Sequence, residues 1–482
     1  MSISRSTSGQ DMNVGCMEGS GADLTLYNEE IIKERMEITN KIRVKSHLRI
    51  GNVRNKTNGK SLLNKELFFS IDKCIELLYT GDEEKIILAI TFLFEIIQEH
   101  PKIINNMRNL EISELFIRVL SFSLSSFAIN LAIGIVFQLF SVHIQFINPF
   151  IDSGFIICLQ QLLSSENEEI IISTIDLIGC MADFSNYARD ALISFGIYYD
   201  IINIITTSDN DHVVDTGFQG LFLLFSNTSL IDSDILKTCV KPIFDLIENS
   251  PSSSLSLVLG ILVEMTNHSY CIAPILFQYN IMPVLISAIS NPELIVVSLG
   301  LIGNLCHTQP PQIIQLMQNG MYGIIEPFLY TNHMSLSLWI LSNIMESIPD
   351  YVIPLISSEL IQYIESCFTT ASSDLKNEIT YFLGTLIIVN NTTDNQAYIK
   401  DDIIDIFVEM LGSGVLFIVI RCLDSIIKLI EVAQVTGNIP KIESFLCNTD
   451  LEDRINDLSH NSNYNICIRM DIIHSFIKLA SK

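Results

Sequence analysis

The sequence has no closely spaced cysteines. Its eleven cysteines lie at least 20 residues apart, so neither a CxxC pair nor another short metal-ligand spacing occurs. We therefore expect neither a metal site nor another cofactor. Scattered single cysteines are typical of buried, reduced thiols, which favours a cytosolic or nuclear protein.

Sequence signals of catalysis and secretion are also missing. There is no phosphate-binding glycine-rich loop and no GxSxG, and the nine histidines form no HExxH pair, so we expect no enzyme. The first residues, MSISRSTSGQDMNVG, have no apolar core and do not resemble a signal peptide. The longest apolar run, residues 127–151, is interrupted by asparagine and glutamine. A membrane span needs about 20 mostly unbroken apolar residues, so a buried helix is the favoured interpretation.

Basic residues are scarce and unevenly placed. The chain has 28 Lys and Arg against 54 Asp and Glu, and nine of the basic residues lie within residues 33–60. From residue 61 onward, 18 basic side chains face 47 acidic ones, a net charge of −29. Such a body repels nucleic acid, whose binding requires neutralised phosphates, and should attract basic peptides instead.

The sequence does contain a repeat, marked by short break-and-restart points. The markers are Ile112, Gly154, Gly196, Asn280, Gly320 and Asp402, separated by 42, 42, 84, 40 and 82 residues. The two long gaps are about twice the short ones, and the missing markers fall near Val240 and Leu360. The period matches armadillo and HEAT units of about 40–47 residues, each built from two or three helices.

Within each unit the apolar residues follow helical spacing, and Gly or Asn at the boundaries suits left-handed helix ends. Strands are a weaker alternative for the isoleucine-rich runs. We predict an all-α fold, a right-handed armadillo-repeat superhelix (α-solenoid) of about nine to ten repeats with a concave face. The expected division is a disordered N-terminus (1–28), a basic arm (29–64) and the armadillo repeat domain (65–482).

The only tryptophan, Trp339, lies four residues before Asn343, in SLSLWILSNIMES. Residues four apart share a helix face. On an inner helix, an exposed indole would offer a wall to the stem of a bound Lys or Arg, while the amide held a peptide backbone. The alternative is a core indole beside a solvated or capping asparagine.

Four stretches carry a resemblance to a known family: SLGLIGNLCHT (298–308), SLWILSNI (337–344), IRCLDSIIKLIEVAQ (420–434) and STIDLIGCMADFSNYARD (173–190). In order and spacing the first three resemble the importin-α (karyopherin-α) family, and the fourth is similar to that family's third repeat. The resemblance implies a nuclear import adaptor that binds basic nuclear-localisation-signal cargo proteins in an acidic groove.

The resemblance also implies site residues. Asn304, Trp339 and Asn343 match the smaller, C-terminal cargo site; Glu378 keeps its acidic position, Tyr381 replaces a Trp, and Thr385 an Asn. At the main site, Asp176, Cys180, Phe222 and Asn227 stand where Trp/Asn pairs are expected, so that site has lost its row of indoles. We expect the C-terminal half of the groove to do most of the binding, or the cargo preference to have diverged.

The arm, KERMEITNKIRVKSHLRIGNVRNK (33–56), resembles an importin-β-binding segment. The residues expected to bind importin-β are Arg35, Arg43, Lys45, Arg49, Arg54 and Lys56. Scattered cations predict weaker autoinhibition of the groove than is usual in the family. By resemblance, an exportin of the CAS type would bind the last repeats, around residues 440–480, and the protein would shuttle between cytoplasm and nucleus. Two alternatives stay open: a solvated or nucleic-acid-binding arm, and an armadillo scaffold for a different protein ligand.

Overall fold

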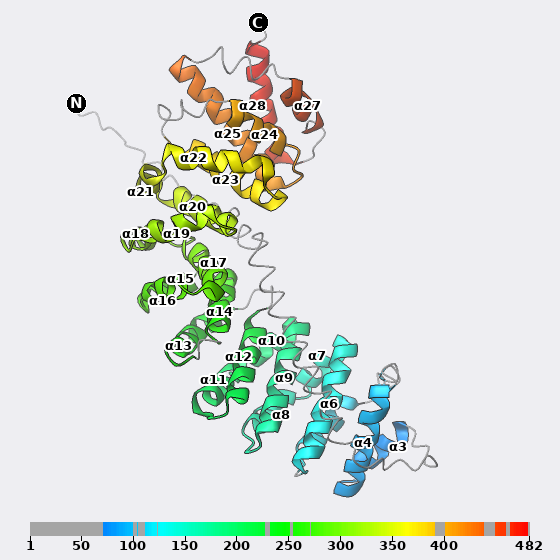
Figure 1. Cartoon of the computed structure of the whole chain (residues 1–482). Coiled ribbons are helices and arrows are strands. Elements are labelled where there is room, and N and C mark those ends of the chain that lie inside the picture. The colour runs from blue at the N-terminus through cyan, green and yellow to red at the C-terminus, as the bar shows by residue number, and fades with distance from the viewer. Residues whose placement is uncertain are drawn as a thin grey trace, which may run out of the picture.

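The computed structural model describes residues 71–99, 104, 111–122, 124–226, 232–250, 254–269, 271–390, 401–437, 449–458 and 463–480. The predicted N-terminal segment and basic arm lie outside these residues. Every regular element in the described residues is an α-helix or a 3-10 helix, and none is a strand. The helices stack into one elongated, curved array, with the chain running from one end to the other (Figure 1). The predicted all-α armadillo-repeat solenoid is confirmed.

Ten helices, one from each repeat, form what we call the inner row. They are α4 (Glu83–Glu99), α6 (Ser126–Val142), α9 (Glu168–Phe184), α12 (Asp211–Phe225), α14 (Leu255–His268), α17 (Ile295–Leu305), α20 (Met334–Ser347), α23 (Ser373–Val389), α25 (Leu416–Thr436) and α28 (Tyr464–Ala480). Each packs against the next in this order. Because each inner helix between the two ends of the row is covered on both sides by its neighbours, one continuous apolar core runs the length of the array.

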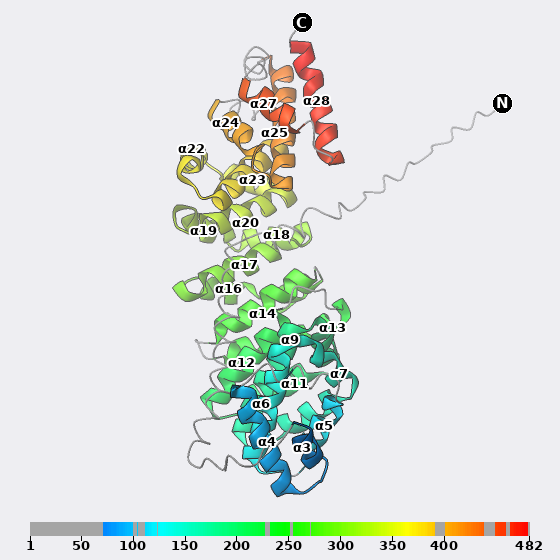
Figure 2. The same cartoon turned by 90° about the vertical axis from the view of Figure 1, so that its right-hand side faces the viewer.

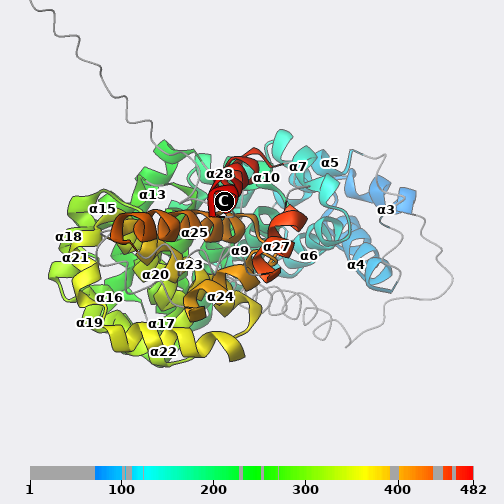
Figure 3. The same cartoon turned by 90° about the horizontal axis from the view of Figure 1, so that it is seen from above.

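Shorter helices complete each repeat. They are α3 (Ile71–Leu78), α5 (Ile112–Leu120), η2 (Ile144–Phe146), α7 (Ile147–Asp152), α8 (Phe155–Leu163), α10 (Asn186–Ser194), α11 (Ile197–Thr207), α13 (Ser233–Asn249), α15 (Ile272–Gln278), α16 (Met282–Ala288), η3 (Pro292–Leu294), α18 (Pro310–Gln318), α19 (Met321–Ile325), η4 (Glu326–Tyr330), α21 (Pro349–Val352), η5 (Ile353–Leu355), α22 (Ser358–Cys367), η6 (Phe368–Thr370), α24 (Asp401–Met410) and α27 (Thr449–Leu458). Seen along the stack, α18 and α19 lie at the outer edge and α20, α23 and α25 nearer the middle (Figure 3). The side view shows the repeats following one another along the array (Figure 2).

Four of the sequence markers are left-handed residues between the first two helices of their repeats. The φ angles are +85° at Gly154, +79° at Gly196, +58° at Asn280 and +81° at Gly320. Glycine and asparagine adopt this region at the least steric cost, which confirms the predicted role of these boundary residues. Ile112 differs, because it is the first residue of α5 rather than a turn.

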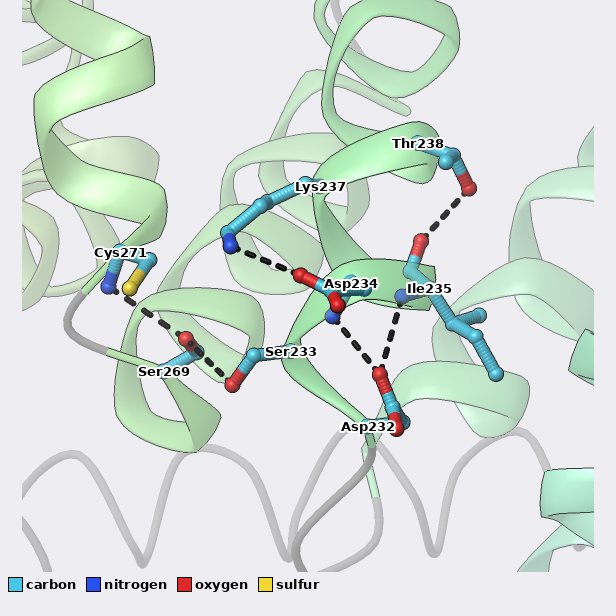
Figure 4. A network of polar contacts seen from close by, with 8 residues as sticks. All are labelled: Asp232, Ser233, Asp234, Ile235, Lys237, Thr238, Ser269 and Cys271. Atoms are coloured by element: carbon cyan, nitrogen blue, oxygen red, sulfur yellow. Dashed lines mark hydrogen bonds and ion pairs between the residues drawn. The ribbon is translucent and has the colours of Figure 1, made fainter.

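The marker missing near Val240 has a structural reason. In that repeat the first two helices are fused into α13, which runs unbroken through Val240 and Pro242. Asp232 caps its start by accepting the backbone N–H of Asp234 at 2.8 Å. The side chains of Ser233 and Ser269 bond at 3.1 Å and tie this start to the end of α14 (Figure 4).

Polar contacts between repeats recur at the spacing of the sequence period. Ser113–Ser153, Gln160–Asp200 and Tyr198–Thr238 are hydrogen-bonded side-chain pairs, each joining residues 40 positions apart. One repeat therefore places equivalent surface positions next to one another.

The long apolar run at residues 127–151 folds as α6, η2 and α7, and α6 is largely buried. No single helix in the described ranges has the length and apolar character to cross a membrane. One pair meets the length and composition test when its two parts, Ser126–Val142 and Ile144–Asp152, are taken together, and it is bent by 120°.

Candidate functional site

The inner row carries the predicted site residues that the structure describes. Asp176 and Cys180 lie on α9 and Phe222 on α12; Asn304 lies on α17, Trp339 and Asn343 on α20, and Glu378 and Tyr381 on α23. Asn227 and the six arm residues, Arg35, Arg43, Lys45, Arg49, Arg54 and Lys56, fall outside the described residues. The repeat thus aligns these side chains on successive helices, and their role in binding stays a prediction.

The expected exposed indole is not found. Trp339 is 1% exposed. Its six-membered ring lies on the backbone of Gly303, where a Cβ would come within 1.8 Å of the indole Cζ3. The prediction of an open wall for a basic side chain is wrong, because the absence of a side chain at position 303 lets the ring sink onto α17.

Asn304 holds two inner helices together. Its Nδ2 lies within hydrogen-bond distance of three acceptors on α14: the Val263 carbonyl at 3.2 Å, Thr266 Oγ1 at 2.9 Å and Asn267 Oδ1 at 2.9 Å. The amide donor that would hold a peptide carbonyl is therefore engaged inside the protein.

Asn343 makes the corresponding contact one repeat later. Its Nδ2 lies 3.2 Å from His307 Nε2. The imidazole also faces the indole of Trp339, at a centroid distance of 6.4 Å. Burial lowers the pKa of His307, although the nearby Glu346 carboxylate opposes this shift. A neutral imidazole is therefore favoured, and it accepts the amide hydrogen when Nε2 is unprotonated.

Some polar atoms at these positions are buried without a hydrogen-bond partner among the described residues. They are Asn304 Oδ1, Trp339 Nε1, Asn343 Oδ1 and Thr385 Oγ1. A buried carbonyl without a donor costs free energy, so their recurrence on α17, α20 and α23 needs a reason. These atoms are sealed from solvent, so a bound chain could reach the two asparagine oxygens only after the side chains that cover them move.

The two predicted residues on α23 differ in what they offer. The Tyr381 ring is covered by the guanidinium of Arg421, whose central carbon lies 4.1 Å from the ring centroid. Burial, with repulsion from Asp374, raises the pKa of Glu378 to about 8. Glu378 is only half-buried, and its role as an acidic position of the groove stays a prediction.

The predicted residues of the larger site are part of the core. Asp176 and Cys180 are buried, and Phe222 is 1% exposed. A Cβ on Gly260 would lie 2.9 Å from Cε2 of Phe222, so this ring packs against α14 and is not free to stack on a ligand. Phe222 is therefore a core residue rather than an exposed ring.

The inner row has a charge pattern that the sequence analysis, which considered individual site residues, did not identify. From α6 to α20, six successive inner helices contain no lysine or arginine. The same helices carry Glu168, Glu169, Asp176, Asp183, Asp211, Asp215, Glu264 and Glu346. Three of these, Glu168, Glu169 and Asp211, lie in first turns, where they also stabilise helix N-termini. The first basic residues beyond this stretch are Lys376 on α23 and Arg421 on α25.

Arg421 and Glu346 were also missed as functional candidates. They lie 75 positions apart in sequence, with Tyr381 between them. The 40 residues between Tyr381 and Arg421 match the repeat period and are the signal that would have paired these two, whereas the 35 residues between Glu346 and Tyr381 fall short of the period.

These features define an armadillo-type repeat scaffold: three-helix or two-helix units of about 40 residues with one long inner helix each. No known family model and no curated protein matches the sequence. The crystal structure of an engineered protein from the Northeast Structural Genomics Consortium is similar with a TM-score of 0.66 and 14% identity, over 85% of this chain and 98% of that one. A designed armadillo repeat protein is similar over 49% of this chain and 100% of its own, with a TM-score of 0.42 and 14% identity. At this identity, the first likeness concerns the fold alone.

Proposed function

We propose that this chain is a non-enzymatic adaptor whose inner row binds a basic segment of a partner protein. The observation that carries the proposal is the run of six inner helices, α6 to α20, without a single lysine or arginine. A solenoid surface with carboxylates and no basic side chains has a negative potential, which raises the local concentration of cationic ligands and speeds their association.

The burial of Asn304 and Asn343 limits what the row offers an extended ligand. Both side chains are more than nine-tenths buried, and they occupy equivalent positions on neighbouring inner helices. Their unpartnered oxygens are closed to a ligand in this structure, so the proposal rests on the acidic charge, which would select lysine- and arginine-rich strands.

The ligand would be recognised by charge rather than by stacking on an open indole. Trp339 lies against Gly303, and the Tyr381 ring is covered by Arg421. Asp215 on α12 is exposed and Asp183 on α9 half-buried, so the carboxylates accessible to a ligand include positions on the third and fourth inner helices. This shifts the expected binding region from the C-terminal half of the row toward α9 and α12.

Nuclear import is the specific form of this proposal. It is supported by the resemblance to importin-α, and it assigns importin-β to the basic arm, nuclear-localisation-signal cargo to the inner row and a CAS-type exportin to the last repeats. It also makes the protein a shuttle between cytoplasm and nucleus.

A scaffold outside nuclear transport is the second candidate. The closed state of Trp339 and Tyr381 favours it, because both rings were expected to stack on cargo. Under this alternative the row binds a different basic protein ligand, and the arm has no affinity for importin-β.

Two measurements on the full chain separate these proposals. The first is binding of fluorescein-labelled oligoarginine at low and high salt; loss of affinity with salt supports the acidic row, and no binding at low salt overturns it. The second is capture of importin-β by the wild type and by the Arg43→Glu, Lys45→Glu double variant. Capture abolished by charge reversal supports import, whereas peptide binding without capture supports the other scaffold.

A further inference from the structure

A polar cluster joins three inner helices, α20, α23 and α25. Arg421 Nη2 lies 2.5 Å from Glu346 Oε1. The Tyr381 hydroxyl donates to the same carboxylate oxygen at 2.7 Å. The guanidinium of Arg421 also bonds the Tyr381 hydroxyl and lies over its ring. One basic side chain thus reaches across a whole repeat to meet a carboxylate.

The stem of Arg421 lies in a slot made by Gly384. A Cβ at position 384 would come 2.7 Å from Cγ and 3.1 Å from Cδ of Arg421. Any larger residue there would displace the stem. The slot therefore depends on glycine on α23, one turn after Tyr381.

The surroundings of Arg421 have the three parts that bind a lysine or arginine side chain. An aromatic face attracts the cation, a carboxylate forms the charge-assisted hydrogen bond, and an open slot takes the aliphatic stem. These parts come from two repeats, because Glu346 lies on α20 and both Tyr381 and Gly384 lie on α23. The side chain that occupies them, Arg421, comes from the next repeat of the same chain. The Arg421 side chain is 17% exposed and that of Glu346 is 29% exposed, so the pair is partly shielded from water.

We propose that Arg421 is a specificity-determining residue that permanently fills a cation receptor formed by Glu346, Tyr381 and Gly384. Because it is tethered to α25, it outcompetes the basic side chains of a ligand at this position. Because Arg421 occupies this position, the part of the inner row that binds basic side chains of a ligand extends no further than α20. The existence of the receptor is independent of the proposed function. The effect of Arg421 on ligand binding rests on the proposed function.

The simpler explanation is an ion pair that only fastens three repeats together. Arg469 provides the matched control, because it pairs with Asp424 between α28 and α25, at 2.6 Å from Nε to Oδ1, and no aromatic ring of the described residues lies over its guanidinium. Removal of either arginine should lower thermal stability. Only removal of Arg421 should leave a receptor for a free cation.

The first experiment tests the receptor with methylguanidinium alone. We compare thermal unfolding of wild type, Arg421→Ala and Arg469→Ala with methylguanidinium chloride and with sodium chloride at equal ionic strength. The receptor predicts a rise in Tm specific to Arg421→Ala and to methylguanidinium, lost when Tyr381→Leu is added. Equal responses of all three proteins overturn it.

The second experiment tests the effect on ligands. Labelled oligoarginine should bind Arg421→Ala about 3- to 10-fold more tightly than wild type, the range of one additional cation–π contact. Arg421→Gln keeps the stem over Gly384 and serves if the alanine variant fails to fold; loss of the cation should again increase affinity. Unchanged affinity in a folded variant overturns the role of Arg421 as the end of the row. Rescue by methylguanidinium with no peptide binding to any variant keeps the receptor and refutes the proposed function instead.

Discussion

The indole of Trp339 lies directly on the backbone of Gly303, one repeat earlier in the chain. A Cβ on Gly303 would come 1.8 Å from Cζ3 and 2.2 Å from Cη2 of the ring. The two residues therefore form one packing unit between α17 and α20. This contact decides that the only tryptophan is a core residue rather than an open binding surface.

Gly303→Ala should destabilise the protein. The added methyl has no space unless the indole moves, and such overpacking costs about 1–3 kcal/mol. Urea unfolding followed by circular dichroism measures the change. Gly323→Ala on α19 is the matched control, because nothing lies within 4 Å of the position that its added methyl would take; it should be neutral or stabilising by up to about 1 kcal/mol through helix propensity. Similar losses for both variants would contradict the Trp339–Gly303 contact.

The fluorescence of Trp339 should report a shielded indole. It is the only tryptophan of the chain, so its emission needs no deconvolution. Emission should be blue-shifted and weakly quenched by iodide in the wild type, and red-shifted and more strongly quenched in Gly303→Ala. Added oligoarginine should leave the wild-type emission unchanged if the ligand is held by charge away from the ring. Quenching as efficient as that of a free tryptophan derivative would show that the indole is open.

Asn304→Ala should be destabilising, whereas Ser298→Ala on the same helix should not. The asparagine amide donates to acceptors on α14, and its removal leaves buried acceptors unpaired, at a cost of about 1–3 kcal/mol. The Ser298 hydroxyl is buried without a hydrogen-bond partner in the described structure, so its loss removes an unpaired group. Chemical denaturation of both variants provides the comparison, and equal stabilities would refute the assigned role of the amide.

Stability should fall as pH rises from about 5 to about 8, in part because of Glu378. Its pKa is raised from 4.5 to about 8 by burial and by Asp374. The folded state therefore keeps a proton that the unfolded state has lost between these two values, so unfolding becomes easier with rising pH in this window. Glu378→Gln should flatten the dependence and be more stable than the wild type near pH 8.

Glu359→Gln is the control for this pH dependence. Hydrogen bonds from its own backbone and from Ser357 lower the pKa of Glu359, so this carboxylate stays ionised in both states above pH 5. Its removal should leave the slope unchanged. An identical slope in the wild type and Glu378→Gln would contradict the raised pKa.

The repeat architecture was predictable because it depends on the residue types at the turns and on their spacing along the chain. Left-handed turns at Gly154, Gly196, Asn280 and Gly320 each follow from a single residue type, and the period between them gives the size of the unit. The fused helix α13 was not predictable from the markers, because the sequence shows only that the marker near Val240 is missing, and the unbroken helix is seen in the structure.

The candidate site was predictable in position but not in exposure. Spacing along the chain correctly put Asn304, Trp339 and Tyr381 on successive inner helices. Whether a side chain on such a helix faces solvent depends on residues one repeat away. At Trp339 that residue is Gly303, and at Tyr381 it is Arg421.

The sequence alone determined the helical repeat, the acidic body and the absence of basic residues along most of the inner row, since composition and period are properties of the chain itself. Only the tertiary structure decided that the indole is covered, that the asparagine donors are engaged and that a carboxylate, a phenol ring and an arginine from three repeats meet. Such contacts join residues about 35 to 75 positions apart, and their geometry is set by how neighbouring helices pack.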